Sequence, residues 1–153
     1  MPEVLRHTEN AVANATGPVY LLLFPISIVC FLGALLTDIA YAMSALLMWL
    51  HFSEWLIASG LAFGVLALLV LLIEFIASRM IRAGPFGWAH LVLFIATLVV
   101  ALFNAFVHTI DGWTAVVPMG MTLSIIGALF AIAAVATLFH VPVAWITRRE
   151  FVR

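Results

Sequence analysis

Long runs of apolar residues separated by short polar stretches dominate this chain of 153 residues. Four runs, at about residues 19–41, 55–78, 86–109 and 114–140, are long enough to cross a bilayer, because a spanning helix needs about 20 mostly apolar residues. The connections between them are short, so consecutive helices must run in opposite directions. The pattern predicts an all-α, polytopic membrane protein built as an antiparallel bundle of four transmembrane helices.

The polar stretches divide the chain into three parts. Residues 1–17 form a polar N-terminal segment, residues 18–142 hold the four predicted spans, and residues 143–153 form a basic tail. Gly84-Pro85 and Asp111-Gly112 mark breaks before the third and fourth spans. We expect no second domain.

The basic residues are all arginines, and the predicted topology puts them on one side of the membrane. One precedes the first span, two lie between the second and third, and three follow the fourth: Arg6, Arg79, Arg82, Arg148, Arg149 and Arg153. The opposite connections, at 42–54 and 110–113, contain no Arg or Lys. The positive-inside rule therefore predicts that both termini, including segment 1–17 and tail 143–153, are cytoplasmic.

Composition excludes several classes of protein. With 67% hydrophobic and 8% charged residues, a chain of this size could not hide its apolar surface as a soluble domain. No basic arm is available for nucleic acid, and the single Cys30 excludes a CxxCH motif for c-type haem. No nucleotide-binding loop or hydrolase motif occurs, so an enzyme is the less favoured class, and the lipid bilayer is the expected environment.

Small residues recur at helical spacing within the spans. Gly60 and Gly64 form a GxxxG motif, and Gly120, Ser124 and Ala128 share one stripe. Such residues let helix backbones approach closely in a membrane. They serve either packing within one bundle or self-association, which would make the chain a homodimer or a subunit of a larger complex.

Ionisable residues at membrane depth are costly, so each one raises a functional question. On the predicted cytoplasmic side, Glu74 and His90 lie about one turn from the basic connection. They could form a polar pair that fixes helix register, or a site that handles a proton, a metal or a cofactor. Glu74 could instead pair with Arg79 or Arg82.

A second group of polar residues falls on the predicted outer side. It comprises Asp38, His51, Glu54, Asn104, His108 and Asp111. Zinc, copper or manganese accepts such donors, which makes His51, His108, Asp38 and Asp111 candidate metal ligands. The spacing matches no established metal motif, and an interfacial histidine is also an ordinary residue.

Haem is the other cofactor that these histidines suggest. His90 and His108 are 18 positions apart, which places them about 27 Å apart along a helix, so they cannot hold one haem together. One histidine with an open coordination position would still allow a haem b. His90, oriented by Glu74, is the best candidate for such cofactor binding.

Several short stretches together resemble one bacterial family. They are Phe24-Pro25-Ile26, Asp38, the segment from Trp55 to Leu61, Ile73-Glu74-Phe75, Trp88-Ala89-His90, Asn104, and the segment from Leu123 to Gly127. In order and spacing, over about residues 18–130, they are similar to the predicted four-span membrane family named domain of unknown function 2231. The resemblance puts Asp38 and His90 on family positions and implies a multi-pass protein of the bacterial inner membrane.

This chain also departs from the family pattern. Pro18-Val19 stands where relatives have a His-Pro pair, Glu74 replaces an Asp, and His108 replaces what is more often an Arg. Some relatives are fused to a Rieske iron–sulfur domain, which implies a redox setting and a possible Rieske-type partner in electron transport. The working hypothesis is an accessory redox protein that binds haem or a quinone-like ligand between helices. The alternative is a structural or small-ion or metal transport protein acting as a homodimer.

Overall fold

The computed structural model is all-helical over the residues that it describes, which are 2–77, 85–110 and 116–140. Side chains are described for 18–76, 87–110 and 116–138. Four long helices follow one another: α1 (Pro2–Ser44), α2 (Leu47–Ala77), α4 (Pro85–His108) and α6 (Met121–His140). A short segment, η1 (Val116–Gly120), which is kinked at the non-helical Val117, leads into α6.

The four predicted spans are confirmed. The segments Pro18–Ser44, Leu47–Ile76, Gly87–His108 and Val116–Leu138 are each long and apolar enough to cross a membrane. Their side chains are apolar on the lipid-facing as well as the inward-facing surface, which is typical of helices whose solvent is a bilayer. The chain is therefore a membrane protein with four spanning helices.

The connection between the first two helices is shorter than the sequence suggested. Only Ala45 and Leu46 separate α1 from α2, because α2 already begins at Leu47. Ala45 turns the chain with a left-handed φ of 54°, and its amide donates to the carbonyl of Tyr41 at 2.7 Å. His51 and Glu54, expected in a loop, lie in the first turns of α2.

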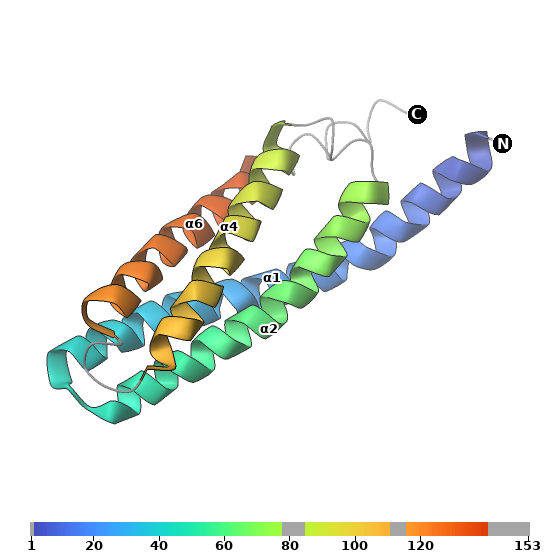
Figure 1. The fold of residues 1–153 in the computed structure, drawn as a ribbon. Helices are drawn as coiled ribbons and strands as arrows, with labels where there is room; N and C mark the ends of the chain where they lie inside the picture. Colours follow the sequence, from blue (N-terminus) through green and yellow to red (C-terminus); the bar gives the residue numbers. More distant parts are fainter. Residues whose placement is uncertain (1, 78–84, 111–115, 141–153) are drawn as a thin grey trace.

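The helices form a ring in which the backbone of each helix packs mainly against two neighbours (Figure 1). α1 packs mainly on α2, α4 packs mainly on α6, and contacts of α2 with α4 and of α1 with α6 close the ring. The start of α1, the end of α2, the start of α4 and the end of α6 lie at the same end of the bundle (Figure 1). α1 and α4 are thus parallel to each other and diagonal across the ring.

These two diagonal helices bury the same positions at a constant offset of 70 residues. On α1 the buried positions include Tyr20, Phe24, Ser27, Ile28, Phe31, Ala34 and Asp38. On α4 they include His90, Phe94, Thr97, Leu98, Ala101, Asn104 and His108. Most steps are of three or four residues, so both helices present one stripe to the centre of the bundle.

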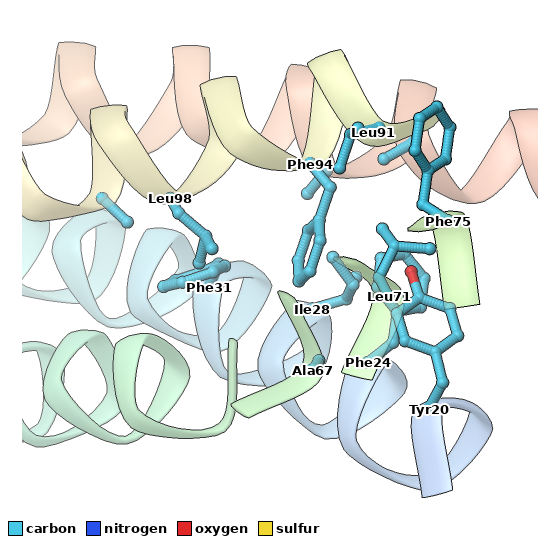
Figure 2. Packing of buried hydrophobic residues seen from close by; sticks show 13 residues of the cluster. Tyr20, Phe24, Ile28, Phe31, Ala67, Leu71, Phe75, Leu91, Phe94 and Leu98 are labelled. Atoms are coloured by element: carbon cyan, nitrogen blue, oxygen red, sulfur yellow. The ribbon is translucent and has the colours of Figure 1, made fainter. Parts of the chain in front are cut away.

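An apolar core fills the middle of the bundle and separates its two ends. Figure 2 shows Phe94 of α4 reaching toward Ile28 of α1, while Phe31 of α1 lies against Leu98 of α4. The rings of Phe24 and Phe94 meet edge to face, with their centroids 5.0 Å apart. A second, smaller group, the end cluster, consists of Tyr41, Leu50 and Val116 and lies near the connection from α1 to α2.

The GxxxG motif of α2 is used inside this bundle. A side chain at Gly60 would place its Cβ 2.6 Å from the ring of Phe31, and one at Gly64 would lie 2.5 Å from Leu98. The Ser27 hydroxyl donates to the carbonyl of Gly60 at 2.8 Å, a contact that needs this close approach. The motif therefore brings α2 against α1 and α4 of the same chain.

Candidate functional site

Five polar side chains meet near the end of the bundle that carries the connection from α1 to α2. This Asp38 layer consists of Asp38 from α1, Ser53 from α2, Asn104 and His108 from α4, and Ser124 from α6. All five are buried, and Asp38 and Ser53 have no exposed surface. The end cluster lies on one side of the layer along the helices and the apolar core on the other.

Asp38 links all four helices through its carboxylate. Its Oδ1 atom accepts a hydrogen bond from the Ser53 hydroxyl and lies 2.9 Å from Nε2 of His108. Its Oδ2 atom accepts a hydrogen bond from the Ser124 hydroxyl at 2.5 Å. A buried carboxylate is tolerated only when it is neutralised and hydrogen-bonded, and these contacts supply both conditions.

The hydrogen-bond partners of His108 determine how many protons the pair of Asp38 and His108 holds. Nδ1 of His108 lies 3.0 Å from the carbonyl oxygen of Asn104, and a carbonyl can only accept, so Nδ1 carries a hydrogen. Nε2 faces an oxygen of Asp38, and a second proton must lie between these two atoms for them to bond. The pair is therefore either imidazolium with carboxylate or neutral imidazole with carboxylic acid, and its net charge is zero in both cases.

His108 has electronegative groups on both sides of its ring. His108 is the last residue of α4, where the aligned carbonyls of the helix carry partial negative charge. Its Nδ1 donates to one of these last carbonyls, that of Asn104. The ring of His108 thus lies between the carboxylate on one side and the helix terminus on the other.

Asn104 has one hydrogen-bonded and one unpartnered amide atom. Its Nδ2 donates to Ser124 at 2.8 Å, while its buried Oδ1 has no hydrogen-bond partner. A small cavity with room for about one water molecule lies beside it. Every helix contributes to its wall, for example Ala34, Ile57, Asn104 and Ser124.

A second polar group, the His90 layer, lies toward the opposite end of the bundle and joins α1, α4 and α6. The Tyr20 hydroxyl bonds Nε2 of His90. Nδ1 of His90 lies 2.8 Å from the Thr137 hydroxyl and 3.0 Å from the carbonyl of Ala134. Since the carbonyl can only accept, Nδ1 carries the hydrogen and Nε2 accepts from Tyr20, so a neutral ring satisfies every partner.

Among the described contacts, the predicted pairing of Glu74 with His90 is not a direct hydrogen bond. Both ring nitrogens of His90 are bonded to groups other than Glu74. Glu74 lies on α2 close enough for its charge to act on the Tyr20 hydroxyl. Arg79 and Arg82, its other candidate partners, lie outside the described residues.

The four candidate metal ligands fall into three places. Asp38 and His108 are in contact within the buried layer. His51 bonds Glu54, one turn further along α2, at 3.2 Å, and both side chains are accessible. Asp111 lies outside the described residues. Within the described part of the chain, no three His, Cys, Asp or Glu side chains gather as a metal site requires.

Four members of these layers could not be recognised from the sequence. Ser53, Ser124, Tyr20 and Thr137 all bond a buried ionisable residue. Hydroxyl side chains in spans commonly bond their own helix, as Thr37 and Thr97 do here. For Tyr20, the spacing along the chain would have been a useful signal. The helix register that brings Asp38 to His108 also brings Tyr20 to His90.

Comparison with known proteins agrees with this fold. No curated protein and no solved structure matches the sequence. The family described as predicted membrane protein (DUF2231) matches it over residues 17–146, which covers all four spans and both polar layers. The resemblance noted from the short motifs is confirmed, and the chain belongs to this family of membrane proteins, domain of unknown function 2231.

Proposed function

We propose that this protein is a non-enzymatic membrane protein of the small-ion transport class, and that the ion it binds is the proton of the Asp38–His108 pair. The observation that carries the proposal is the hydrogen-bond pattern of His108. Oxygen acceptors face both ring nitrogens, so the pair holds one proton more than a bare carboxylate and a neutral imidazole.

Release of that proton would affect the whole bundle. It would leave one uncompensated negative charge in a site with almost no exposed surface. Such a charge costs several kcal/mol, roughly 3–5 when one partner of a buried pair is lost. Because Asp38 bonds residues of all the other helices, the way to lower that cost is to change how the helices pack and admit water or a cation.

The apolar groups on either side of the layer support a gated site rather than an open channel. The end cluster separates the Asp38 layer from the nearer membrane surface, and the apolar core separates it from the His90 layer. A proton therefore reaches Asp38 only when one of these barriers opens. With both termini in the cytoplasm of a bacterial cell, the nearer surface would be the outer face of the inner membrane.

Proton flux into liposomes tests this proposal. Purified protein is reconstituted with a pH-sensitive dye inside and the same sodium chloride solution on both sides, and a pH step is applied. We expect wild type to dissipate the step faster than empty liposomes, and Asp38→Asn to remove that difference. Glu54→Gln is the matched control, since this carboxylate lies at the same end and, among the described residues, hydrogen-bonds the accessible His51 rather than a member of the Asp38 layer. Wild-type flux equal to that of empty liposomes would overturn the proposal.

The redox hypothesis requires a different set of contacts around His90. A haem on His90 would require the ring to give up Tyr20 on one nitrogen or Ala134 and Thr137 on the other. Haem b, a quinone-like ligand and a Rieske-type partner therefore stay predictions. Protein purified from its native membrane would show a Soret band that His90→Ala shifts or removes; a spectrum without this band would exclude the haem version.

A further inference from the structure

We propose that Asn104 is a positioning residue for proton release from the Asp38–His108 pair. Its side-chain amide holds the Ser124 hydroxyl as a hydrogen-bond donor to Asp38, so this donor is already in place when the carboxylate is left with a negative charge. The inference rests on the proposed function and names the residue that prepares its site for the charged state.

The direction of two consecutive hydrogen bonds is the first observation. Nδ2 of Asn104 donates to the hydroxyl oxygen of Ser124 at 2.8 Å, and that hydroxyl donates to Oδ2 of Asp38 at 2.5 Å. An amide nitrogen only donates, so it cannot take the single hydroxyl proton of Ser124, which is left to Asp38. Without the amide, a hydroxyl in a span can turn to a carbonyl of its own helix, as Thr97 does.

Ser53, which bonds the other oxygen of Asp38, has two acceptors within reach. Its hydroxyl bonds Oδ1 of Asp38 and also lies 3.2 Å from the carbonyl oxygen of Ala34, and one proton cannot serve both acceptors fully. Oδ1 is also the atom that shares a proton with His108. The carboxylate thus has one oxygen with a dedicated donor, Oδ2, and one at which the proton is exchanged, Oδ1.

The orientation of the Asn104 amide has a cost. Its Oδ1 atom has no hydrogen-bond partner among the described residues, and Asn104 is only 3% exposed, so bulk water does not satisfy this oxygen. The cavity beside it is lined mostly by apolar side chains. A buried acceptor in this state destabilises the fold, and a leucine of similar volume would avoid that loss. Such an exception to good packing is expected where a residue serves a function.

A donor that already points at Asp38 matters at the moment when the proton leaves. The carboxylate then carries an uncompensated charge, and a hydrogen bond to a charged group is stronger than one between neutral groups. Because Asn104 fixes Ser124 beforehand, no hydroxyl has to reorient at that step. The main-chain carbonyl of Asn104 accepts from Nδ1 of His108 at 3.0 Å, and substitutions at this position keep that carbonyl. Side-chain variants therefore change the Ser124 side of the site.

A double-mutant cycle in the liposome assay tests this role. Asn104→Leu removes the amide at similar volume, and Ser124→Ala removes the hydroxyl that it orients. We expect each to slow proton flux on the order of 10-fold, the effect of one lost hydrogen bond to a charged group. The double variant should be no slower than Ser124→Ala, because both changes remove the same donor.

Thr122→Val is the control for this cycle, because the exposed Thr122 hydroxyl bonds the carbonyl of Pro118 one turn earlier, and we expect wild-type flux from it. Wild-type flux in Asn104→Leu would overturn the inference. A double variant slowed by the product of the two single effects would overturn it as well.

The infrared band of the Asp38 carboxyl group, assigned with Asp38→Asn, gives a readout that loss of packing alone does not produce. Asn104→Leu and Ser124→Ala both take a donor from Oδ2, so we expect them to shift this band in the same direction by a similar amount. Asn104→Ala is the second variant if Asn104→Leu does not fold. A band at its wild-type position in the Asn104 variant would contradict the role of the amide.

The two proposals fail in different ways. Wild type without flux above that of empty liposomes overturns the proposed function, while the infrared band still shows whether Asn104 holds Ser124 on Asp38. Wild-type flux that persists in Asn104→Leu, with an unshifted band, overturns only the role of Asn104. A shifted band with unchanged flux also overturns the inference, because the contact then has no part in proton release.

Discussion

Asp38 shows how a single side chain can determine the packing of a membrane bundle. Lipid tails are as apolar as leucine, so burying apolar area contributes little to holding the helices together, and polar contacts and close packing contribute more. Asp38 bonds Ser53, His108 and Ser124, one residue from each of the other helices. Its removal should therefore loosen every helix at once.

Loss of the carboxylate should be among the most destabilising substitutions in the chain. We expect Asp38→Asn to lower the free energy of unfolding by about 3–5 kcal/mol, because it leaves the His108 ring without its counter-charge in a buried site. Reversible unfolding in mixed micelles measures the change. The double variant Asp38→Asn/His108→Gln should lose less than the sum of the two single variants, since it removes both partners together.

The accessible pair on α2 gives the matched comparison. Glu54→Gln breaks a contact with His51, whose side chain is 62% exposed, and surface pairs of this kind contribute about 0–1 kcal/mol. Equal losses for Glu54→Gln and Asp38→Asn would contradict the assignment of Asp38 as the centre of the layer.

Tyr20 should matter through its hydroxyl rather than its ring. Tyr20→Phe keeps the ring contacts with Phe24 and Phe94 but leaves Nε2 of His90 without a donor. We expect a loss of about 1–3 kcal/mol in the same unfolding measurement, the cost of an unsatisfied buried acceptor. A change in the nitrogen-15 shift of His90 Nε2 should accompany it, and an unchanged shift would mean that the hydrogen bond does not form.

Residue-level prediction succeeded where the signal was local. Asp38, His90 and His108 could be singled out because an ionisable group inside an apolar run is unusual wherever it points. Ser53 and Ser124 could not be singled out in this way, because hydroxyl residues bond their own helix elsewhere in the chain. Only the relative register of the four helices distinguishes a bond within one helix from a bond between helices. His51 shares the predicted outer side with Asp38 and His108, but hydropathy gives depth and not facing, and in the structure the His51 side chain faces outward.

At the scale of the helix, close approach at glycine sets the geometry of α2. The ring of Phe31 occupies the space that a side chain at Gly60 would need, and Ser27 bonds the carbonyl exposed there. An aromatic ring cannot yield as the end of an aliphatic chain can, so α2 would have to move outward from α1.

Alanine substitutions at two glycines should therefore differ in effect. We expect Gly60→Ala to cost about 1–3 kcal/mol through overpacking, which a lower melting temperature in detergent would report. Gly127→Ala is the control, because its Cβ would meet only Val100, at an ordinary 3.6 Å. If the two variants have the same melting temperature, the contact of Gly60 with Phe31 does not govern the packing of α2.

The ends of the helices were harder to predict than their middles. The predicted connection at 42–54 contains His51 and Glu54, whose polarity suggested a loop, yet α2 already runs through both. Hydropathy reports the part of a helix that lies in lipid, and it does not report helical turns that continue beyond the hydrocarbon core. With 31 residues, α2 is longer than the roughly 20 that a bilayer core needs.

For the whole molecule, the topology predicts which side of the membrane each polar layer faces. The start of α1 and the end of α6 share one end of the bundle (Figure 1), and the arginines flank that end in the sequence. We expect a green fluorescent protein fused after Arg153 to fluoresce and an alkaline phosphatase fused there to be inactive. The reverse pattern would place the Asp38 layer on the cytoplasmic side.

The constant offset of 70 residues between the buried positions of α1 and α4 also bears on how the chain could be connected. The same offset of 70 residues pairs Tyr20 with His90 and Asp38 with His108. The first helical hairpin therefore occupies its half of the ring much as the second does. The order in which the two hairpins are joined should then be of little consequence. A circularly permuted chain that begins near Pro85 and returns from α6 to α1 through a short linker should assemble the same bundle.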